Sequence, residues 1–281
     1  MLNYNGNLVA FDDVKITPNN RAFKYGDSVF ETIKVVHGKL VFWEEHYFRL
    51  MASMRMLRMK IPMNFTLEFL EEQILKTVSV NENNKNTRTR LSVTRKDGGF
   101  YTPNTNEIDY LIESQEIEYS TKASYKVDLF KDFYMYSGHL STVKTNNKLI
   151  HTLASIYAKE NELDNCILLN ERKGVVEVTN ASLFLIKGTL IKTPPLTEGC
   201  LKGIAREKVI SVITSSNNYT LEEAIISPFE IQKADEVFIT NSIIGIQPIT
   251  NYRKKEFSTD ISKKLAMSFN CLLYTSPSPR D

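Results

Sequence analysis

Apolar and polar residues alternate with two different periods along the first part of the chain. From Trp43, apolar side chains recur at the spacing of an amphipathic helix, which we expect to end near Lys60, and a second helix is expected at about 66–80. On both sides of this helical region, short apolar runs are separated by turn residues, which is typical of antiparallel strands. The expected turns lie at Gly6, at His37-Gly38-Lys39 and at Gly98-Gly99.

Short strand patterns dominate the second half of the chain. The sequences CILLN, VVEV, SLFLIKG and TLIKT are apolar runs of strand length divided by turn residues, and EVFITNSIIGIQPI predicts a late strand and turn. Two helices interrupt them, one from about Asn147 to Asn161 and one at about 204–215. The apolar side of the first of these helices is expected to consist of Leu149, Leu153, Ile156 and Tyr157.

The order of these patterns predicts two domains that mix helices and strands. We expect an N-terminal domain at 1–118, a crossing segment at 119–124 and a second, strand-rich domain at 125–270. Residues 271–281, CLLYTSPSPRD, differ abruptly in composition from the charged helical stretch before them. They resemble the in-frame translation of a sequencing adapter, and we expect them to lie outside the fold. A natural tail rich in Pro and Ser is the alternative.

Composition and charge exclude several classes of protein. Of the 281 residues, 42% are hydrophobic and 24% are charged, which is typical of a folded globular chain rather than a disordered or fibrous one. Lys and Arg number 35 and Asp and Glu 33, so the net charge of +2 gives no electrostatic reason to expect nucleic acid as a partner. No run reaches the roughly 18 apolar residues of a membrane span. Three scattered cysteines indicate neither a disulfide framework nor a zinc site, and they favour the reducing cytoplasm.

Several common catalytic motifs are missing from the sequence. It contains no G-x-G-x-x-G or G-x-x-x-x-G-K-[ST] nucleotide loop, no H-E-x-x-H and no G-x-S-x-G, and its four histidines lack metal-ligand spacing, so no metal site is expected. Six other segments carry residues that could take part in catalysis or ligand binding. In chain order they are RAFKYGDSVFETIKV, EEHYFRL, LSTVKTNNKL, GVVEVTNASLFLIKG, PPLTEGCLKGIARE and ADEVFITNSIIGIQPI.

In their order and spacing, these six segments resemble the fold-type IV pyridoxal-phosphate enzymes, the class IV aminotransferase family. This family includes branched-chain aminotransferases, D-amino acid aminotransferases and 4-amino-4-deoxychorismate lyases, and the resemblance extends from about Asn3 to Asn270. It implies an enzyme with the two-domain α/β fold of D-amino acid aminotransferase and with pyridoxal 5'-phosphate between the domains. It also implies a cytoplasmic homodimer that acts on a small amino or carboxylate substrate.

The resemblance assigns Lys144 as the lysine that binds the cofactor covalently and then moves the substrate proton. That chemistry requires an amine with a lowered pKa, which a desolvated pocket beside a cationic ring supplies. Glu177 matches the glutamate that pairs with the pyridine nitrogen, so that the ring can accept electrons. Without the family, Lys144 would be interpreted as a solvated loop lysine and Glu177 as a solvent-facing strand residue.

Phosphate-binding residues also follow from the resemblance. Arg49 matches the arginine whose fork of donors binds the phosphate, whereas its spacing from Glu45 alone would indicate a surface ion pair on one helix. The backbone N–H groups of Gly203 and Ile204, where a turn opens a helix, and the hydroxyl of Ser242 are expected to bind the same phosphate.

Departures from the family pattern favour one member. Thr32, a candidate catalytic residue, stands where branched-chain enzymes usually have Gly and lyases usually keep Thr. Leu149 replaces the tyrosine of branched-chain enzymes, and TRKDGGFY lacks the Arg-x-His pair of D-amino acid enzymes. These features resemble 4-amino-4-deoxychorismate lyase, which releases pyruvate and leaves 4-aminobenzoate, a folate precursor. Arg90 or Arg95 is the candidate for the substrate carboxylate, although either is equally well interpreted as a strand-surface charge.

Two other hypotheses stay open. The same departures are compatible with neutral drift in an amino-acid transaminase, of the branched-chain or the D-amino acid type, that uses a 2-oxo acid acceptor. A non-catalytic cofactor-binding dimer is supported only by Ser182 and Ala205, which stand where the family usually has Asn and Thr. Retention of Lys144, Glu177 and Arg49 argues against this last hypothesis.

Overall fold

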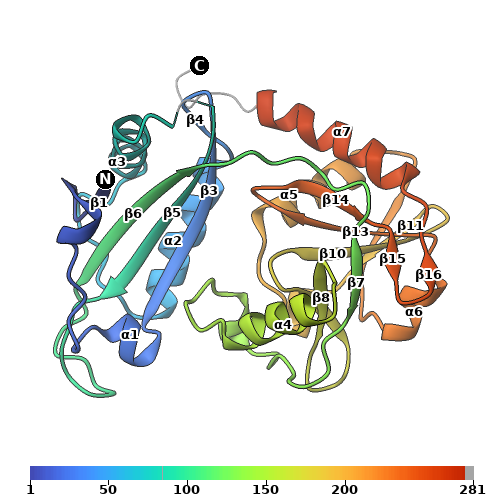
Figure 1. Cartoon of the computed structure of the whole chain (residues 1–281), viewed down its shortest axis with the longest axis horizontal. Helices are drawn as coiled ribbons and strands as arrows, with labels where there is room; N and C mark the ends of the chain where they lie inside the picture. Colours follow the sequence, from blue (N-terminus) through green and yellow to red (C-terminus); the bar gives the residue numbers. More distant parts are fainter. Residues whose placement is uncertain (84, 276–281) are drawn as a thin grey trace. The chain divides into compact units, whose positions relative to one another are not determined.

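The chain folds into two compact units. They are seen in a computed structural model that describes residues 1–83 and 85–275 (Figure 1). Unit 1 contains Met1–Glu118 together with Lys144–Asn147, and unit 2 contains Tyr119–Val143 and the described chain from Lys148 to residue 275.

The short segment Lys144–Asn147 packs with unit 1, although it lies inside the range 125–270 expected for the second domain. Asn84, in the expected polar loop, and residues 276–281 of the C-terminal segment lie outside the described residues. The part of that segment before residue 276 continues helix α7 (Asp260–Thr275).

Unit 1 is built on a six-stranded sheet with the strand order β2-β1-β6-β5-β3-β4, in which every neighbouring pair is antiparallel. The expected hairpin turn is confirmed, because His37 and Gly38 both have positive φ angles, of 47° and 76°. The strands are β1 (Leu2–Tyr4), β2 (Asn7–Val9), β3 (Ser28–Val36), β4 (Lys39–Leu40), β5 (Asn86–Arg95) and β6 (Ile108–Glu116).

Two long helices cover one face of this sheet, α2 (Trp43–Met56) and α3 (Leu67–Val80), and a short helix α1 (Arg21–Tyr25) lies before β3 (Figure 1). The hydroxyl of Thr66 accepts a hydrogen bond from the N–H of Phe69 and caps α3 where the sequence predicts its start. Helix α2 ends earlier than the expected Lys60. Its chain turns away at Arg58, which has a φ of 57°.

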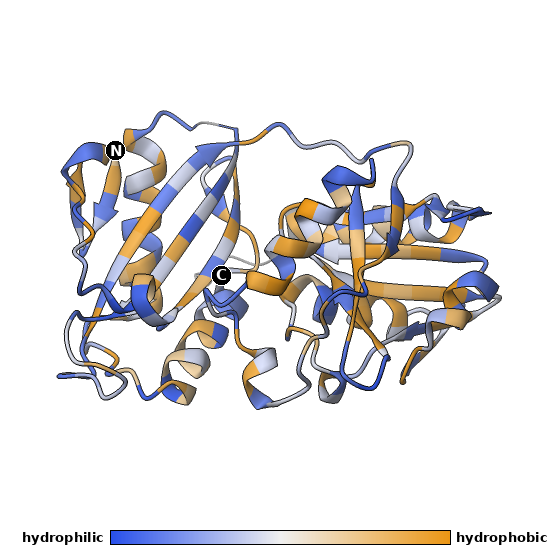
Figure 2. Ribbon diagram, turned by 60° about the horizontal axis from the view of Figure 1, so that its bottom comes forward, coloured by the Kyte–Doolittle hydropathy of each residue, from blue (hydrophilic) through white to orange (hydrophobic). Residues whose placement is uncertain are grey.

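The two faces of the sheet differ in burial. Along β3 and β5, every second residue is buried against the helices, and the residues between them are mostly half-buried. Figure 2 shows this as alternating hydrophilic and hydrophobic positions along the strands. The half-buried face therefore carries polar side chains, among them Thr32, Lys34, Arg88 and Arg90.

Unit 2 contains two five-stranded sheets, with the orders β12-β11-β10-β13-β14 and β16-β15-β7-β8-β9. Its central strands are hydrophobic almost throughout, because both of their faces are buried (Figure 2). The strands are β7 (Lys126–Leu129), β8 (Asn165–Leu169), β9 (Val175–Val178), β10 (Ser182–Lys187), β11 (Leu190–Thr193), β12 (Thr220–Glu223), β13 (Glu236–Asn241), β14 (Gly245–Ile249), β15 (Asn251–Tyr252) and β16 (Lys255–Glu256).

The helices of unit 2 are α4 (Leu149–Glu160), α5 (Ile204–Thr214), α6 (Pro228–Lys233) and α7. Single turns of 3-10 helix lie at Phe11–Asp13 in unit 1 and at His139–Thr142 and Leu196–Glu198 in unit 2. Within the described residues, no helix has the length and apolar character needed to span a membrane.

The inward face of α4 differs from the expected one. Of the four residues expected on the apolar side, Leu153 and Tyr157 pack against the buried cluster, whereas Leu149 and Ile156 are 72% and 48% exposed. The buried residues are instead His151, Ala154 and Ala158, at the spacing i, i+3, i+7. Small side chains allow the helix to approach strand β8 closely, and a histidine therefore lies on the inner side of a helix among apolar residues.

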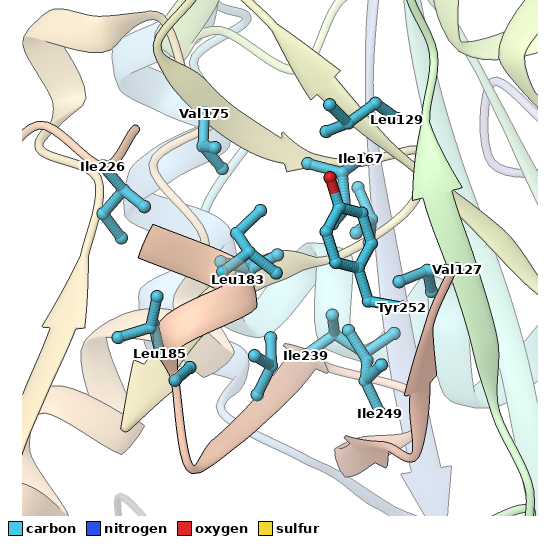
Figure 3. Packing of buried hydrophobic residues seen from close by; sticks show 14 of the residues in the cluster. Val127, Leu129, Ile167, Val175, Leu183, Leu185, Ile226, Ile239, Ile249 and Tyr252 are labelled. Carbon is cyan, nitrogen blue, oxygen red and sulfur yellow. The ribbon is translucent and has the colours of Figure 1, made fainter. Parts of the chain in front are cut away.

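The main core of unit 2 is formed where side chains of the two sheets meet. Figure 3 shows side chains from β7, β8, β10, β13, β14 and β15 pointing toward one another. Leu183 and Ile239 are fully buried in this cluster, and the ring of Tyr252 is 1% exposed. Packing of two apolar faces against each other fixes the positions of β9 and β10, which carry residues of interest below.

We expect Ile239→Ala to lower the free energy of unfolding by about 2–5 kcal/mol, because it leaves a cavity between two sheets. The matched control is Ile225→Ala, since Ile225 is 61% exposed whereas Ile239 is 0% exposed. Urea unfolding of the two variants measures the difference. Equal losses would contradict the core assignment.

Candidate active site

The sequence-predicted site residues fall into two groups. Unit 1 holds Thr32, Arg49, Arg90, Arg95 and Lys144, and unit 2 holds Glu177, Gly203, Ile204 and Ser242.

Lys144 is placed by a short stretch of strand pairing with β3. The N–H of Phe30 donates to the carbonyl of Lys144 over 2.9 Å, the N–H of Asn146 donates to the carbonyl of Ser28 over 3.1 Å, and Val29 and Thr145 form an antiparallel bridge. Residues directly opposite in such a pair project to the same face. The lysine Nζ accordingly lies 4.6 Å from the centre of the Phe30 ring, on the half-buried face of the sheet.

Arg90 and Thr32 lie on the same face as Lys144. They are direct partners across β3 and β5. The guanidinium carbon of Arg90 lies 3.7 Å from the centre of the Phe30 ring, so Phe30 contacts the cations of both Arg90 and Lys144. Arg90 also donates to Asn146 Oδ1 over 2.9 Å and to Ser92 Oγ over 3.1 Å. The structure therefore brings together three of the predicted residues.

The half-buried face around Lys144 is rich in cations. Lys34 and Arg88 are paired across the strands next to Thr32 and Arg90, and Glu113 is the acidic partner of Arg90 on β6. Burial lowers the pKa of Lys34, and burial also lowers the pKa of Arg90, against the opposing charge of Glu113. Partly desolvated cations of this kind favour carboxylates as ligands.

Arg95 lies on the opposite, helix-covered face and has a structural environment. Its Nε donates to Asp27 Oδ2 over 2.9 Å, and its other nitrogens donate to the Asn106 side chain and to the carbonyls of Leu57 and Arg58 at the end of α2. All three nitrogens of the Arg95 guanidinium have acceptors in these contacts, and the group holds the helix end against the sheet. The structure does not place Arg95 with Lys144.

Asp27, which accepts from Arg95, also binds Arg21. The Nε of Arg21 donates to Asp27 Oδ2 over 2.9 Å. The terminal nitrogens of Arg21 donate to the carbonyls of Gly98, Phe100 and Tyr101 in the loop between β5 and β6. One carboxylate therefore anchors two arginines.

Arg49 lies in a buried cluster of charged groups on the helix-covered face. Its Nε and one terminal nitrogen donate to the two oxygens of Glu31 over 2.8 and 2.5 Å, and His46 Nδ1 lies 2.7 Å from Glu31. The Arg49 side chain is 10% exposed, which is too buried for the surface pair that its helical spacing alone indicates. Glu31 therefore holds one edge of the guanidinium.

Burial and neighbouring charges change the pKa values of Glu31 and His46 in this cluster. Burial works to raise the pKa of Glu31, but the ion pair with Arg49 and the hydrogen bonds from Arg49 and His46 outweigh burial and lower the pKa to about 2. Burial lowers the pKa of His46, and the charges of Arg49 and Lys144 add to this effect against the opposing effect of Glu31. His46 is fully buried, and its Nε2 has no hydrogen-bond partner among the described residues.

Glu177 is buried in β9, not solvent-facing. His151 Nε2 lies 2.9 Å from its Oε1, and the N–H of Leu201 donates to its Oε2 over 3.0 Å. Burial works to raise the pKa of Glu177, but the hydrogen bond and charge of His151, the charge of Lys148 and the Leu201 N–H outweigh it. The pKa therefore lies below its ordinary value, and the carboxylate is ionised at neutral pH.

Helix α5 begins close to the hydroxyl group of Ser182. Gly203 is its N-cap and has no side-chain cap, and a Cβ at Gly203 would lie 3.0 Å from Ser182 Oγ. Thr240 is the direct partner of Ser182 across β10 and β13, so both project to the same face, and Thr240 Oγ1 is buried with no partner in the described chain. Ser242 follows in the turn after β13.

This arrangement has the character of an anion site, because the first N–H groups of a helix lack intrahelical partners. Of the two N–H groups expected there, that of Gly203 donates to the carbonyl of Leu201 over 2.8 Å. The N–H of Ile204 is at the first helical position.

The comparisons with known proteins place the chain in a family. A family model described as amino-transferase class IV matches residues 28–252. The chain belongs to the class IV aminotransferase family.

Relatives in this family have different activities. A putative branched-chain-amino-acid aminotransferase of Methanocaldococcus jannaschii is 29% identical, over 94% of this chain and 93% of its own length. An aminodeoxychorismate lyase of Vibrio harveyi is 27% identical, over 86% and 89%, and a D-alanine aminotransferase of Listeria monocytogenes is 29% identical, over 88% and 86%.

Solved structures share the class IV fold. A branched-chain aminotransferase of Thermoproteus uzoniensis with norvaline has a TM-score of 0.88 at 23% identity, covering 98% of this chain and 95% of its own. A branched-chain amino acid aminotransferase of T.th. with pyridoxamine 5'-phosphate has a TM-score of 0.88 at 22% identity, with the same coverage. The mixed α/β fold implied by the sequence resemblance is confirmed.

Sequence reasoning missed four buried polar residues that lie near predicted site residues, two in unit 1 and two in unit 2. Glu31 and His46 are identified by their mutual contact. In the sequence, Glu31 could be noticed as a polar residue at a buried strand position, and His46 as a histidine three residues before Arg49. His151 is recognisable only as a polar residue at the inward spacing of α4. Thr240 has no distinct signal, because a threonine in an apolar strand is common.

Glu31→Gln should lower the free energy of unfolding at neutral pH by about 3 kcal/mol, because it removes the charge that two nitrogens of the buried Arg49 guanidinium bind. In the wild type, the folded-state pKa of Glu31, about 2, lies below the ordinary value of 4.5, so its stabilisation is present above pH 4.5 and is lost as the pH falls toward 2. The variant should lack this loss.

Urea unfolding at several pH values, followed by the fluorescence of the single tryptophan Trp43 in α2, measures both effects. Glu116→Gln, at the exposed end of β6, is the control. A variant with wild-type stability and the wild-type acid profile would contradict the assignment.

Proposed function

We propose that this class IV protein is a pyridoxal-phosphate-dependent lyase that converts 4-amino-4-deoxychorismate into 4-aminobenzoate and pyruvate. Support for the cofactor comes from the family and from a related structure that contains pyridoxamine 5'-phosphate. Support for the reaction comes from Thr32, the cationic face around Lys144, and the relative described as an aminodeoxychorismate lyase.

The residues present fit the cofactor. Glu177 is an ionised carboxylate suited to a protonated ring nitrogen, and the start of α5 offers an Ile204 N–H with the orphan hydroxyl of Thr240 nearby on the same unit. The roles of Arg49, in unit 1, and Ser242, in unit 2, toward the phosphate rest on the family resemblance. When bound, pyridoxal phosphate supplies a ring that accepts the electrons left behind when a proton leaves the substrate.

Lys144 has two tasks in this proposal. Its amine would hold the cofactor covalently, and its Nζ would take the proton from the substrate ring carbon that carries the nitrogen. The Phe30 ring contacts both Lys144 and Arg90, so the lysine lies beside a second cation on the half-buried face of the sheet.

The observation that carries the choice of substrate is the cationic face. Aminodeoxychorismate has two carboxylates, one on its ring and one on its enolpyruvyl group, and Lys34, Arg88 and Arg90 lie side by side around Thr32. Arg90 is the member of this group held in a fixed orientation, by Asn146 and Phe30, and we assign it to a substrate carboxylate. Arg95 is not part of the proposal.

The reaction needs no further reactant. The C–O bond to the enolpyruvyl group breaks, the ring becomes aromatic after losing its proton, and a proton added to the departing carbon skeleton gives pyruvate. The atoms of the two products together equal those of the substrate. Lys144 therefore serves first as the base, and its protonated Nζ then serves as the acid that returns a proton.

An amino-acid transaminase with a 2-oxo acid acceptor is the second candidate. The relatives described as branched-chain and D-alanine aminotransferases favour it. A transaminase needs one carboxylate site and a pocket for the amino-acid side chain, so it has less use for three neighbouring cations on one sheet. The homodimer and the cytoplasmic location remain predictions from the resemblance.

Incubation of the cofactor-loaded protein with 4-amino-4-deoxychorismate should release pyruvate and 4-aminobenzoate in equal amounts, and Lys144→Ala should abolish release. Coupled reduction of pyruvate and fluorescence of 4-aminobenzoate measure the two products. Amino-group transfer from L- or D-amino acids to 2-oxo acids, with no pyruvate from aminodeoxychorismate, would replace the lyase by the transaminase.

Arg90→Gln should raise KM for aminodeoxychorismate by roughly 10- to 100-fold, because a charge-assisted pair with a carboxylate is worth about 1.5–3 kcal/mol. Arg55→Gln, at an exposed position of α2, should leave KM unchanged. Steady-state kinetics of both variants test the assignment, which an unaltered KM in Arg90→Gln would refute.

A further inference from the structure

Glu177 is held by two donors that come from different elements. His151 Nε2 reaches Oε1 from the inward side of α4, and the Leu201 N–H reaches Oε2 from the loop before α5. The side chains of Glu177 and His151 are 7% and 11% exposed. A carboxylate only accepts hydrogen bonds, so the proton in the first contact belongs to the histidine Nε2.

We propose that His151 is a positioning residue, which fixes the rotation of the Glu177 carboxylate and keeps it anionic toward a cationic ring nitrogen. The proposal rests on the proposed function, since it concerns the same cofactor. Each carboxylate oxygen has two lone pairs. One hydrogen bond to each oxygen therefore fixes the plane of the group and leaves one lone pair per oxygen for a further donor.

The surroundings of Glu177 explain why a histidine is required. On the α4 side, Glu177 faces His151 and Lys148, and on the loop side it faces the Leu201 N–H and the thiol of Cys200. Burial raises the pKa of the Cys200 thiol to about 12, so that group remains neutral. His151 supplies the direct side-chain hydrogen bond, and Lys148 acts through its charge.

Loss of the hydrogen bond has two consequences. A buried carboxylate with one donor fewer binds a proton more readily, because desolvation is then less well compensated. The group is also free to rotate about its last bond. A protonated or misdirected Glu177 would no longer hold a proton on a pyridine nitrogen, and the substrate carbon would then be less acidic.

The test compares His151→Leu, which removes the donor, with His151→Gln, which keeps an N–H donor at the end of a flexible chain. His139→Leu is the matched control, because His139 is exposed. The first readout uses the cofactor-free protein labelled with 13C at the glutamate carboxyls. The Glu177 resonance is assigned by its absence in Glu177→Gln, and its acid titration is followed by NMR.

In the wild type, His151→Gln and His139→Leu, we expect Glu177 to titrate below the usual glutamate range. In His151→Leu, the midpoint should rise by at least one pH unit, which is a tenfold weaker acid. The second readout is the pH dependence of the visible absorbance after addition of pyridoxal phosphate. Its midpoint should shift in His151→Leu, with a fall in kcat of tenfold or more, and should be restored in His151→Gln.

The outcomes separate the two proposals. A Glu177 titration that is the same in His151→Leu and in the wild type overturns the positioning role, whatever the cofactor does. Equal defects in His151→Leu and His151→Gln also overturn it, because they indicate a packing role. Absence of a cofactor band in the wild type instead rejects the proposed function, and the NMR titration still decides whether His151 controls Glu177.

Discussion

The pairing of residues 144–146 with the edge of β3 determines where the chemistry of unit 1 is placed. Strand β4 pairs only with the last residues of β3, so the edge at Ser28 and Phe30 is available to a segment from much later in the chain. Backbone hydrogen bonds fix the register, and the register decides which face receives each side chain. A shift by one residue would put Lys144 on the helix-covered face with Arg95 and Glu31. The hydrogen bonds of one strand edge therefore control where the Lys144 amine lies.

Buried ionised groups distinguish both units from ordinary cores. Glu31 in unit 1 and Glu177 in unit 2 are desolvated carboxylates, and each is kept ionised by a histidine and a further donor on neighbouring elements. Such groups are expensive to bury, and apolar residues of similar size would generally make a more stable core. Buried groups of this kind occur often at functional sites, where a fixed charge is needed. In each case the histidine contributes a directed hydrogen bond from a helix to a strand.

Much of the fold follows from sequence periodicity, and the exceptions have physical causes. The long helix ending at Val80 and the His37-Gly38 turn are confirmed because strong periods and turn residues specify them locally. The elements β12, α6, β15 and β16 have two to six residues each, too few to display a period. The inward face of α4 was predicted only in part: Leu153 and Tyr157 pack inward as expected, but Leu149 and Ile156 are exposed, and small residues and a histidine are the most buried.

The candidate site was predictable only in part, for a related reason. Residue type and order suggested Lys144, Glu177 and Arg49 through the family resemblance. Their partners depend on which helix covers which face, and no local pattern reports that, so Glu31 and His151 became evident only in three dimensions. Arg90 and Arg95 belong to one strand pattern, yet their opposite faces give them opposite environments.

The double use of Asp27 has a consequence for motion. Through Arg21 this carboxylate is linked to the carbonyls of the β5–β6 loop, and through Arg95 it is linked to the end of α2. Neither the loop nor the helix end can separate from the sheet without leaving a nearly buried guanidinium short of acceptors. The two segments should therefore open as one cooperative unit, and their amide hydrogens should exchange with solvent at a common rate although they are far apart in sequence.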